Sequence, residues 1–226
     1  FIEMNYLVME ALIKSQNNLM DSMQSRLKQY NQREMDQRLF VDLLTGNIAH
    51  DEEENYRLKE QKWPLPPYQI IYIEVDRIKQ KLHELREEEA QERIEKIENL
   101  IREAFSGEQV VVLSNNGTFQ CILKRTGDKE IGADYFEAIQ REICEKTGYT
   151  ATIGVSRAED TYKRFGQAYQ DARDAVEIAV CQNLESRVLC IEDAGFWKIL
   201  KKISKQDMCR EFVEEKLNAF IEYDQE

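Results

Sequence analysis

The sequence predicts an α/β (α+β) fold, a mixed sheet flanked by helices, preceded by a long N-terminal helix. From residue 68 onward, short apolar runs typical of strands alternate with longer runs of helical periodicity, and two of the apolar runs form a hairpin. The first thirty residues instead carry a heptad pattern and contain neither Gly nor Pro. Residues 63–67 hold all three prolines of the chain and predict a rigid connector into the first strand.

The N-terminal heptads predict a continuous helix that forms a dimeric coiled coil, and we assign residues 1–45 to this dimerisation and signalling element. The a and d positions are apolar except for Gln16. A methionine-rich seam packs adaptably, which suits a helix that shifts or rotates during signalling. The predicted dimer seam consists of Ile2, Tyr6, Met9, Ile13, Met20, Met23, Leu27 and Tyr30.

An alternative for the same segment is a single amphipathic helix packed on its own domain. Four apolar residues off the seam favour it: Met4, Leu7, Val8 and Leu12. The heptad pattern breaks at Glu34 and Gln37, and apolar residues resume at 39–44 before Gly46. Glycine at this place is a typical helix stop.

The α/β domain is predicted over residues 46–192. Acidic residues at 51–54 begin a short polar helix, and a buried strand at 69–75 follows the prolines. A helix at roughly 78–105 carries many Glu and Lys residues, which indicate a solvated face. Two apolar runs joined by an Asn-Gly turn predict the hairpin 109–124.

The second half of the domain continues the alternation, and residues 193–226 are predicted to be a helical connector. Apolar residues at helical spacing, or in short runs, define each element. The predicted elements are helix 131–147, strand 150–155, helix 161–181, strand 188–191 and the helix-like segment 207–221.

Composition limits the classes of function. Forty-three acidic residues against thirty-one Lys and Arg give a net charge of −12, which disfavours direct DNA binding by this part of a protein. No apolar run is long enough to span a bilayer, so no membrane partner is expected. Five cysteines without a C-x-x-C pair predict reduced thiols in a cytoplasmic protein. The missing initial Met suggests a fragment of a longer polypeptide.

One pair of acids is a candidate metal site. Glu74 and Asp76 stand one residue apart at the end of the apolar strand 70–73, and carboxylate oxygens are the ligands that Mg²⁺ prefers. The plainer interpretation is that both are solvated acids at a strand end. A Cys–His nucleophile would need His50 or His83, both in polar segments, and neither Gly-x-Ser-x-Gly nor a phosphate loop is present. We therefore predict no enzyme activity and no cofactor.

These acids and the hairpin tip resemble the GGDEF nucleotide-cyclase domain. In that family, two Asp residues followed by Phe-Lys hold magnesium, and the glycines and acid of the tip serve the guanosine phosphates and the metal. Here Glu74 replaces the first Asp and Ile78 replaces the Phe. The tip, residues 115–119, keeps one glycine and no carboxylate. The resemblance therefore implies a degenerate, non-catalytic GGDEF-like domain.

Five further segments resemble the GGDEF-like middle domain, and its flanks, of PucR/CdaR-type bacterial transcriptional regulators. The resemblance implies a dimerising middle domain, an unknown small-molecule effector, and DNA binding through a C-terminal helix-turn-helix that would follow Glu226. Response regulators with an AraC-type DNA-binding domain share part of the middle. The segments are 39–46, 152–157, 165–175, 193–200 and 217–224.

We therefore predict a homodimeric signal-relay fragment of a DNA-binding transcriptional regulator. Two alternatives stay open. One is a divergent domain that binds a nucleotide, GTP or a cyclic dinucleotide, or acts like a diguanylate cyclase. The other is a module that senses a small metabolite, since degenerate enzymes often keep a pocket.

Overall fold

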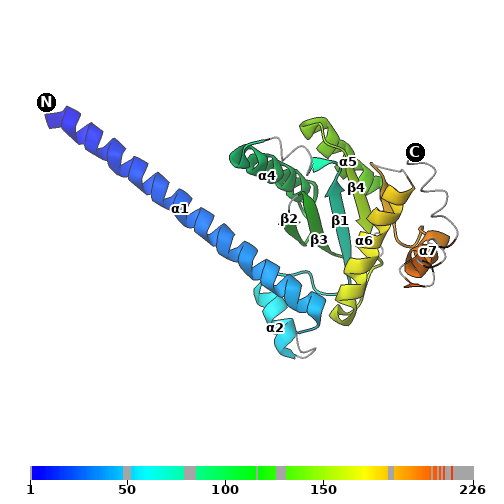
Figure 1. Ribbon diagram of the computed structural model, residues 1–226. Helices are drawn as coiled ribbons and strands as arrows, with labels where there is room; N and C mark the ends of the chain where they lie inside the picture. The colour runs from blue at the N-terminus through cyan, green and yellow to red at the C-terminus, as the bar shows by residue number, and fades with distance from the viewer. Residues whose placement is uncertain are drawn as a thin grey trace.

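The computed structural model describes residues 2–47, 52–78, 85–115, 117–125, 131–182 and 186–204, together with residues 206, 207, 209, 211 and 215. A long helix precedes a five-stranded sheet with helices on both faces (Figure 1). The elements in chain order are α1 (Ile2–Thr45), α2 (Glu52–Glu60), β1 (Tyr68–Val75), α4 (Glu87–Ala104), β2 (Val110–Asn115), β3 (Thr118–Lys124), α5 (Ala133–Thr147), β4 (Ala151–Val155), η1 (Tyr162–Arg164), α6 (Phe165–Cys181), β5 (Val188–Cys190) and α7 (Phe196–Ser204).

The strand order is β2-β3-β1-β4-β5, with β1 at the centre. The pairs β2–β3, β1–β3 and β1–β4 are antiparallel, whereas β4 and β5 are parallel, so the sheet is mixed as predicted. The hairpin closes with a two-residue turn between Asn115 and Thr118, as the Asn-Gly pair predicts. This topology places the end of β1 beside the hairpin tip.

Strand alternation produces two apolar cores, one on each face of the sheet. Ile71, Ile73 and Val75 of β1 face α4 and α5. Tyr68 and Ile70 face the opposite way and join the core formed with α6 and the end of α1. Figure 1 shows α4 and α5 on one side of the sheet and α6 on the other. The sequence prediction of a flanked mixed sheet is confirmed.

Helix α1 runs without interruption over 44 residues. Its last turns enter the core, where Leu39 and Leu43 are buried, and Gly46 ends it with a left-handed φ of +68°. Its N-terminal half projects away from the domain (Figure 1). The break in the heptad pattern at Glu34 and Gln37 marks where the surroundings of the helix change and not where the helix stops.

Two predictions about the charged helix are wrong. The predicted helix 78–105 is not continuous: Ile78 is helical, residues 79–84 lie outside the described part, and α4 begins at Glu87 after the extended residue Arg86. Its Glu and Lys residues are not all solvated, because Glu98 is buried at the edge of the sheet. Most of the helix-like segment 207–221 also lies outside the described residues. None of the described helices combines the length and hydropathy needed to cross a bilayer.

Candidate functional site

The two acids singled out in the sequence lie where β1 ends. Glu74 pairs across the sheet with Thr118 on one side and Thr152 on the other. Asp76 Oδ1 accepts a hydrogen bond of 2.9 Å from Thr152 Oγ1, and the backbone N–H of Asp76 donates to Thr150 O at 2.9 Å. Asp76 Oδ2 is buried and has no hydrogen-bond partner in the described part of the chain. The end of β1 therefore lies next to the hairpin tip, and Oδ2 of Asp76 is the carboxylate oxygen without a described hydrogen bond.

The hairpin tip is closed by an apolar side chain. Gly117 has φ +86°, and a Cβ built on it would lie 2.2 Å from Ile78 Cγ2. Ile78 is itself buried, and the backbone N–H of Val75 donates to Gly117 O at 3.1 Å. The close approach of the turn backbone is therefore used to pack Ile78, which fills the space beside the tip.

The hydroxyl of Thr118, the cross-strand neighbour of Glu74, stabilises the turn. Thr118 Oγ1 donates to Asn115 O at 2.7 Å and accepts from Gln120 Nε2 at 3.3 Å. Burial raises the pKa of neighbouring Tyr72 above its ordinary value, and a hydrogen bond with Thr118 opposes that rise. This environment is polar and partly buried, but among the described residues Glu74 and Asp76 belong to no group of three acids, His or Cys that could hold a metal ion.

Metal and nucleophile chemistry find little support among the described residues. No group of three or more His, Cys, Asp or Glu side chains is placed there to hold a metal ion. Burial raises the pKa of the Cys121 thiol to about 12, so it stays protonated at neutral pH and is a poor nucleophile. His50 and His83 lie outside the described residues.

A third acid, Glu98 on α4, accepts hydrogen bonds from three other side chains, and sequence reasoning missed it. Its side chain is 3% exposed, and Oε1 accepts from Arg33 of α1 at 3.2 Å and from Arg102 at 2.8 and 3.0 Å. Oε2 accepts from Ser114 Oγ of β2 at 2.8 Å. One carboxylate therefore joins the long helix, α4 and the hairpin strand.

Arg102 extends this junction to the sheet. Its Nη2 also donates to the carbonyl of Val112 at 2.7 Å, which satisfies a backbone acceptor of β2, the edge strand. In the sequence, Glu98 stands among many other acids of a charged helix, and only its spacing of four from Arg102 gave any signal.

A second polar contact fixes α1 close by. Asp36 Oδ1 accepts from Trp63 Nε1 at 2.8 Å and from Gln32 Nε2 at 3.0 Å. Trp63 is fully buried. Burial raises the pKa of Asp36 above its ordinary value, although the two hydrogen bonds and the charge of Arg102 oppose the rise. Arg33 and Asp36 together fix the orientation of α1 on the domain.

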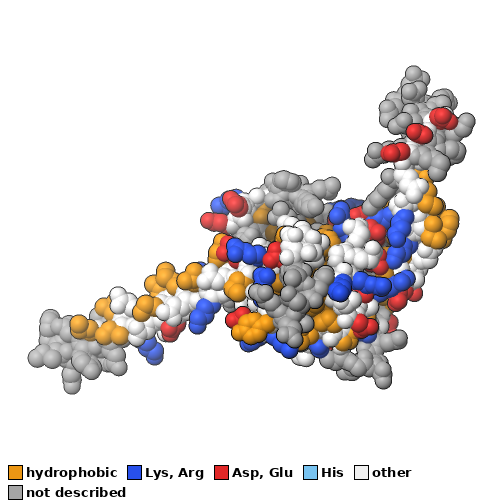
Figure 2. All heavy atoms as spheres, turned by 90° about the horizontal axis from the view of Figure 1, so that it is seen from below, with side chains coloured by type: hydrophobic (Ala, Val, Ile, Leu, Met, Phe, Trp, Pro, Cys, Tyr) orange, Lys and Arg blue, Asp and Glu red, His pale blue; other side chains and the backbone are white. Residues whose placement is uncertain are grey.

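The predicted dimer seam lies on the free half of α1. Its described members from Met9 to Tyr30 are between 54 and 66% exposed, and the side chains of Ile2 and Tyr6 lie outside the described part. Figure 2 shows apolar side chains along this projecting helix. The alternative packing rested on four apolar residues off the seam, of which Leu12 is also exposed, while the side chains of Met4, Leu7 and Val8 lie outside the described part. The exposed seam residues are Met9, Ile13, Met20, Met23, Leu27 and Tyr30.

Residues 45–178 match the family model described as the GGDEF-like domain, which is more than half of the chain. The chain belongs to the GGDEF-like domain family. No curated protein matches it. The match covers the GGDEF-like domain and does not identify the chain as part of a PucR/CdaR-type regulator.

Several solved structures are similar to this GGDEF-like protein. The active GGEEF domain of a diguanylate cyclase from Vibrio cholerae is 16% identical, over 69% of this chain and 95% of that one, with a TM-score of 0.49. The coiled coil and GGDEF domain of DgcB from Caulobacter crescentus, in complex with c-di-GMP, is 12% identical over 80% and 98% of the two chains, with a TM-score of 0.46. The diguanylate cyclase SiaD from Pseudomonas aeruginosa, in complex with its activator SiaC, is 16% identical over 82% and 77%, also with 0.46.

Proposed function

We propose that this chain is a homodimeric signal-relay module whose GGDEF-like domain is not catalytic. The observation that carries the proposal is the exposed apolar seam on the free half of α1. Long rows of exposed apolar side chains at heptad spacing are typical of interfaces and are costly in water. A projecting helix of this length also gains much of its stability from packing, which a second copy of α1 would supply.

The relay part of the proposal rests on how the base of α1 is held. Leu39 and Leu43 are buried in the core, and Phe40 packs edge-on against the rings of Phe165 and Tyr169 of α6. The contact of Arg33 with Glu98 adds a polar constraint. Since the seam and these contacts lie on one continuous helix, a rotation at the seam would reach α4, β2 and α6.

The absence of catalysis is supported by the hairpin tip. The tip, residues 115–119, has no carboxylate where the resemblance expects one, and Ile78 packs against the turn. Binding of Mg²⁺ with a triphosphate needs several hard oxygen ligands. Glu74 and Asp76 alone provide a poor set.

The finer proposal concerns the parent protein, a cytoplasmic PucR/CdaR-type regulator that binds DNA through a separate C-terminal domain. It rests on the sequence resemblance, with residues 1–45 as the dimerising helix, 46–192 as the GGDEF-like domain and 193–226 as the connector. In a dimeric regulator, the spacing of two DNA-binding domains must match the spacing of the half-sites. A helix-turn-helix encoded directly after Glu226 would support this proposal, and an unrelated domain there would contradict it.

The dimer is tested by placing charges in the seam. Met20→Glu with Leu27→Glu should halve the mass measured by light scattering, because two like charges would face their copies across an apolar interface. Asn18→Glu with Ser25→Glu adds the same charge on the opposite face of the helix and should leave the dimer intact. An unchanged mass in the seam variant, or a monomeric unmodified chain, would overturn the proposal.

A second candidate function is nucleotide binding, or a diguanylate cyclase-like activity. Family membership and the buried, unpartnered Oδ2 of Asp76 favour it. Calorimetry with GTP and Mg²⁺, and a turnover assay with GTP, test it directly. Heat or product that disappears in Glu74→Ala would establish this function, whereas no heat and no product would exclude it.

A further inference from the structure

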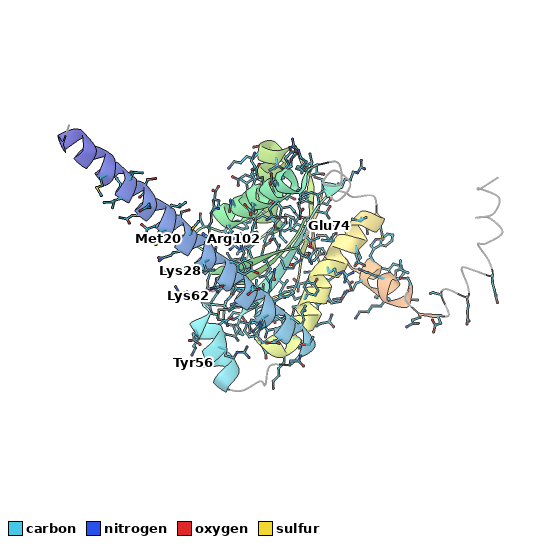
Figure 3. The ribbon with its side chains drawn as sticks, turned by 60° about the vertical axis from the view of Figure 1, so that its left-hand side comes forward. Met20, Lys28, Tyr56, Lys62, Glu74 and Arg102 are labelled. Atoms are coloured by element: carbon cyan, nitrogen blue, oxygen red, sulfur yellow. The ribbon has the colours of Figure 1, made fainter. Side chains whose placement is uncertain are left out.

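A groove runs between α1 and the domain at the place where the helix crosses α4 and β2. Three adjoining cavities of about 600, 270 and 360 Å³ compose it. The first and second cavities share Gln29, Arg33 and Asn99, and the second and third share Gln32, Asp36 and Arg102. We call this the α1–α4 groove. Figure 3 shows Arg102 and Lys62, which lines the third cavity, close to α1.

The groove is lined by nitrogen donors. Arg26, Arg33 and Arg102 contribute guanidinium groups, and Gln29, Gln32 and Asn99 contribute amides. Glu95 and Asp36 are the acids in these two cavities. The third cavity adds Lys62 and Glu60, and Glu98 pairs with Arg33 and Arg102, so the charges of the groove are nearly balanced. The capacity for an anion therefore rests on guanidinium N–H groups that these acids leave unused. Guanidinium groups bind carboxylates and phosphates through paired, charge-assisted hydrogen bonds.

The arginines keep donors available for a ligand. The bonds to Glu98 use Nη2 of Arg33, and both Nε and Nη2 of Arg102. In the described part of the chain, Nη1 of neither guanidinium takes part in a hydrogen bond or an ion pair. Since Glu98 already orients both groups, little side-chain entropy remains to be lost on binding.

The spacing of the arginines gives the shape of the ligand. Arg26 and Arg33 are seven residues apart and line one cavity, so their Cα atoms are about 10 Å apart along the helix. Arg102 lies at the inner end beside Arg33. We propose that the α1–α4 groove binds a small elongated ligand with anionic groups, carboxylate or phosphate, at both ends. One end lies at Arg26, and the other lies at Arg33 and Arg102.

If the proposed function holds, a ligand bound in the α1–α4 groove would affect the dimer. Tyr30 belongs to the seam and lines the first cavity, and Arg26 and Arg33 flank the seam in the heptad pattern. A ligand that accepts from Nη1 of Arg33 leaves the Nη2 contact with Glu98 in place and adds a second constraint on the same guanidinium group. Binding would therefore change how α1 is held on the domain and how its seam is presented to a second copy.

Calorimetry on the full 226-residue chain tests the site, with suberate and hexane-1,6-diyl bisphosphate as elongated probes that carry an anionic group at each end, at constant ionic strength and with acetate as the monovalent control. We expect saturable binding of at least one probe and none of acetate. Tighter binding of the bisphosphate would indicate a phosphate ligand, and tighter binding of suberate would indicate a carboxylate ligand. No saturable binding of either probe would overturn the proposal, as would an equal response to acetate.

A charge-matched pair of variants locates the site. Arg26→Gln should weaken binding about tenfold, which corresponds to one lost charge-assisted contact, without touching the Glu98 junction. Lys28→Gln removes the same charge from an exposed position of α1 outside the groove and should leave the affinity unchanged. Equal losses in the two variants would mean nonspecific charge attraction.

The seam variant separates this proposal from the dimer. A monomeric Met20→Glu/Leu27→Glu chain should still bind the probe, because every proposed contact lies within one chain. Loss of binding in that monomer would overturn the single-chain site. Binding by an unmodified chain that proves to be a monomer would keep the site and reject the dimer.

Discussion

Asp76 is a partly buried acid and Glu98 is a fully buried one, and the two differ in how many hydrogen bonds their carboxylates accept. Asp76 keeps one carboxylate oxygen bonded to Thr152 and leaves the other buried without a described partner. Glu98 uses both oxygens and connects three separate elements. Asp76, which lies in the sequence motif, thus uses only one side-chain oxygen in a described hydrogen bond. Glu98, which lies in no motif, connects the long helix to the sheet. In this GGDEF-like domain, the polar network has been built at the edge strand and not at the hairpin tip.

Removing the Glu98 carboxylate should give the largest effect. Glu98→Ala should lower the free energy of unfolding by about 3 kcal/mol, because it removes a buried carboxylate that accepts hydrogen bonds from Ser114 and from two partly exposed arginines. Urea unfolding at a fixed protein concentration measures it, since a dimer's stability depends on concentration. Glu95→Ala, an exposed acid on the same helix, should change stability by less than about 0.5 kcal/mol. Equal effects would remove Glu98 from its assigned role.

The second largest loss of stability is expected at the hairpin tip, where packing and not charge is disturbed. Gly117→Ala should cost about 2 kcal/mol, because a side chain is strained at this φ and its Cβ would collide with Ile78. Gly107→Ala is the control, with φ +96° and nothing within 4 Å of its Cβ, and should lose only the conformational part. Thermal unfolding of the two variants separates the contributions. Equal losses would mean that Ile78 does not close the tip.

Substitution of Asp76 should lower stability less than substitution of Glu98 or Gly117. Asp76→Ala should cost about 1 kcal/mol, the usual value of one hydrogen bond, here that of Thr152. The same measurement with added Mg²⁺ sharpens the comparison. The unmodified chain should show no Mg²⁺-dependent rise in melting temperature. A rise that Asp76→Ala abolishes would mean that the acid holds a cation.

The smallest effect should be a pH dependence from Asp36, near the Glu98 junction. Burial raises its native pKa above 3.8, so the native state keeps its proton over a pH range in which the unfolded chain has lost it. Its contribution to stability is therefore complete below pH 3.8 and falls as pH rises through the raised native value. Asp36→Asn keeps an acceptor for Trp63 and should remove this part of the slope.

Urea unfolding across that pH range measures the slope for the two proteins. Asp21→Asn, at an exposed position of the same helix, serves as the control and should leave the slope unchanged. Identical slopes in Asp36→Asn and the unmodified chain would contradict the assignment.

Most of the fold could be predicted because it depends on local patterns. The hairpin and its turn, the central strand and the glycine that ends α1 all appear where alternation and turn chemistry placed them. The start of α4 and the buried state of Glu98 could not be predicted. A Glu in a helix rich in Glu and Lys looks solvated until an edge strand and a second helix are known to lie against it. The candidate site was predicted only as a pair of acids, and their partners come from strands distant in sequence.

The mixed sheet, the long helix and its apolar seam follow from the order of residues, because periodicity and turn residues act over a few neighbouring positions. The packing of Ile78 against the hairpin tip and the meeting of Arg33, Glu98, Arg102 and Ser114 follow from the folded arrangement of the chain. Hydrogen bonds and close packing of this kind depend on distances between segments up to 81 residues apart, counted from Arg33 to Ser114. Local patterns carry no information about those distances.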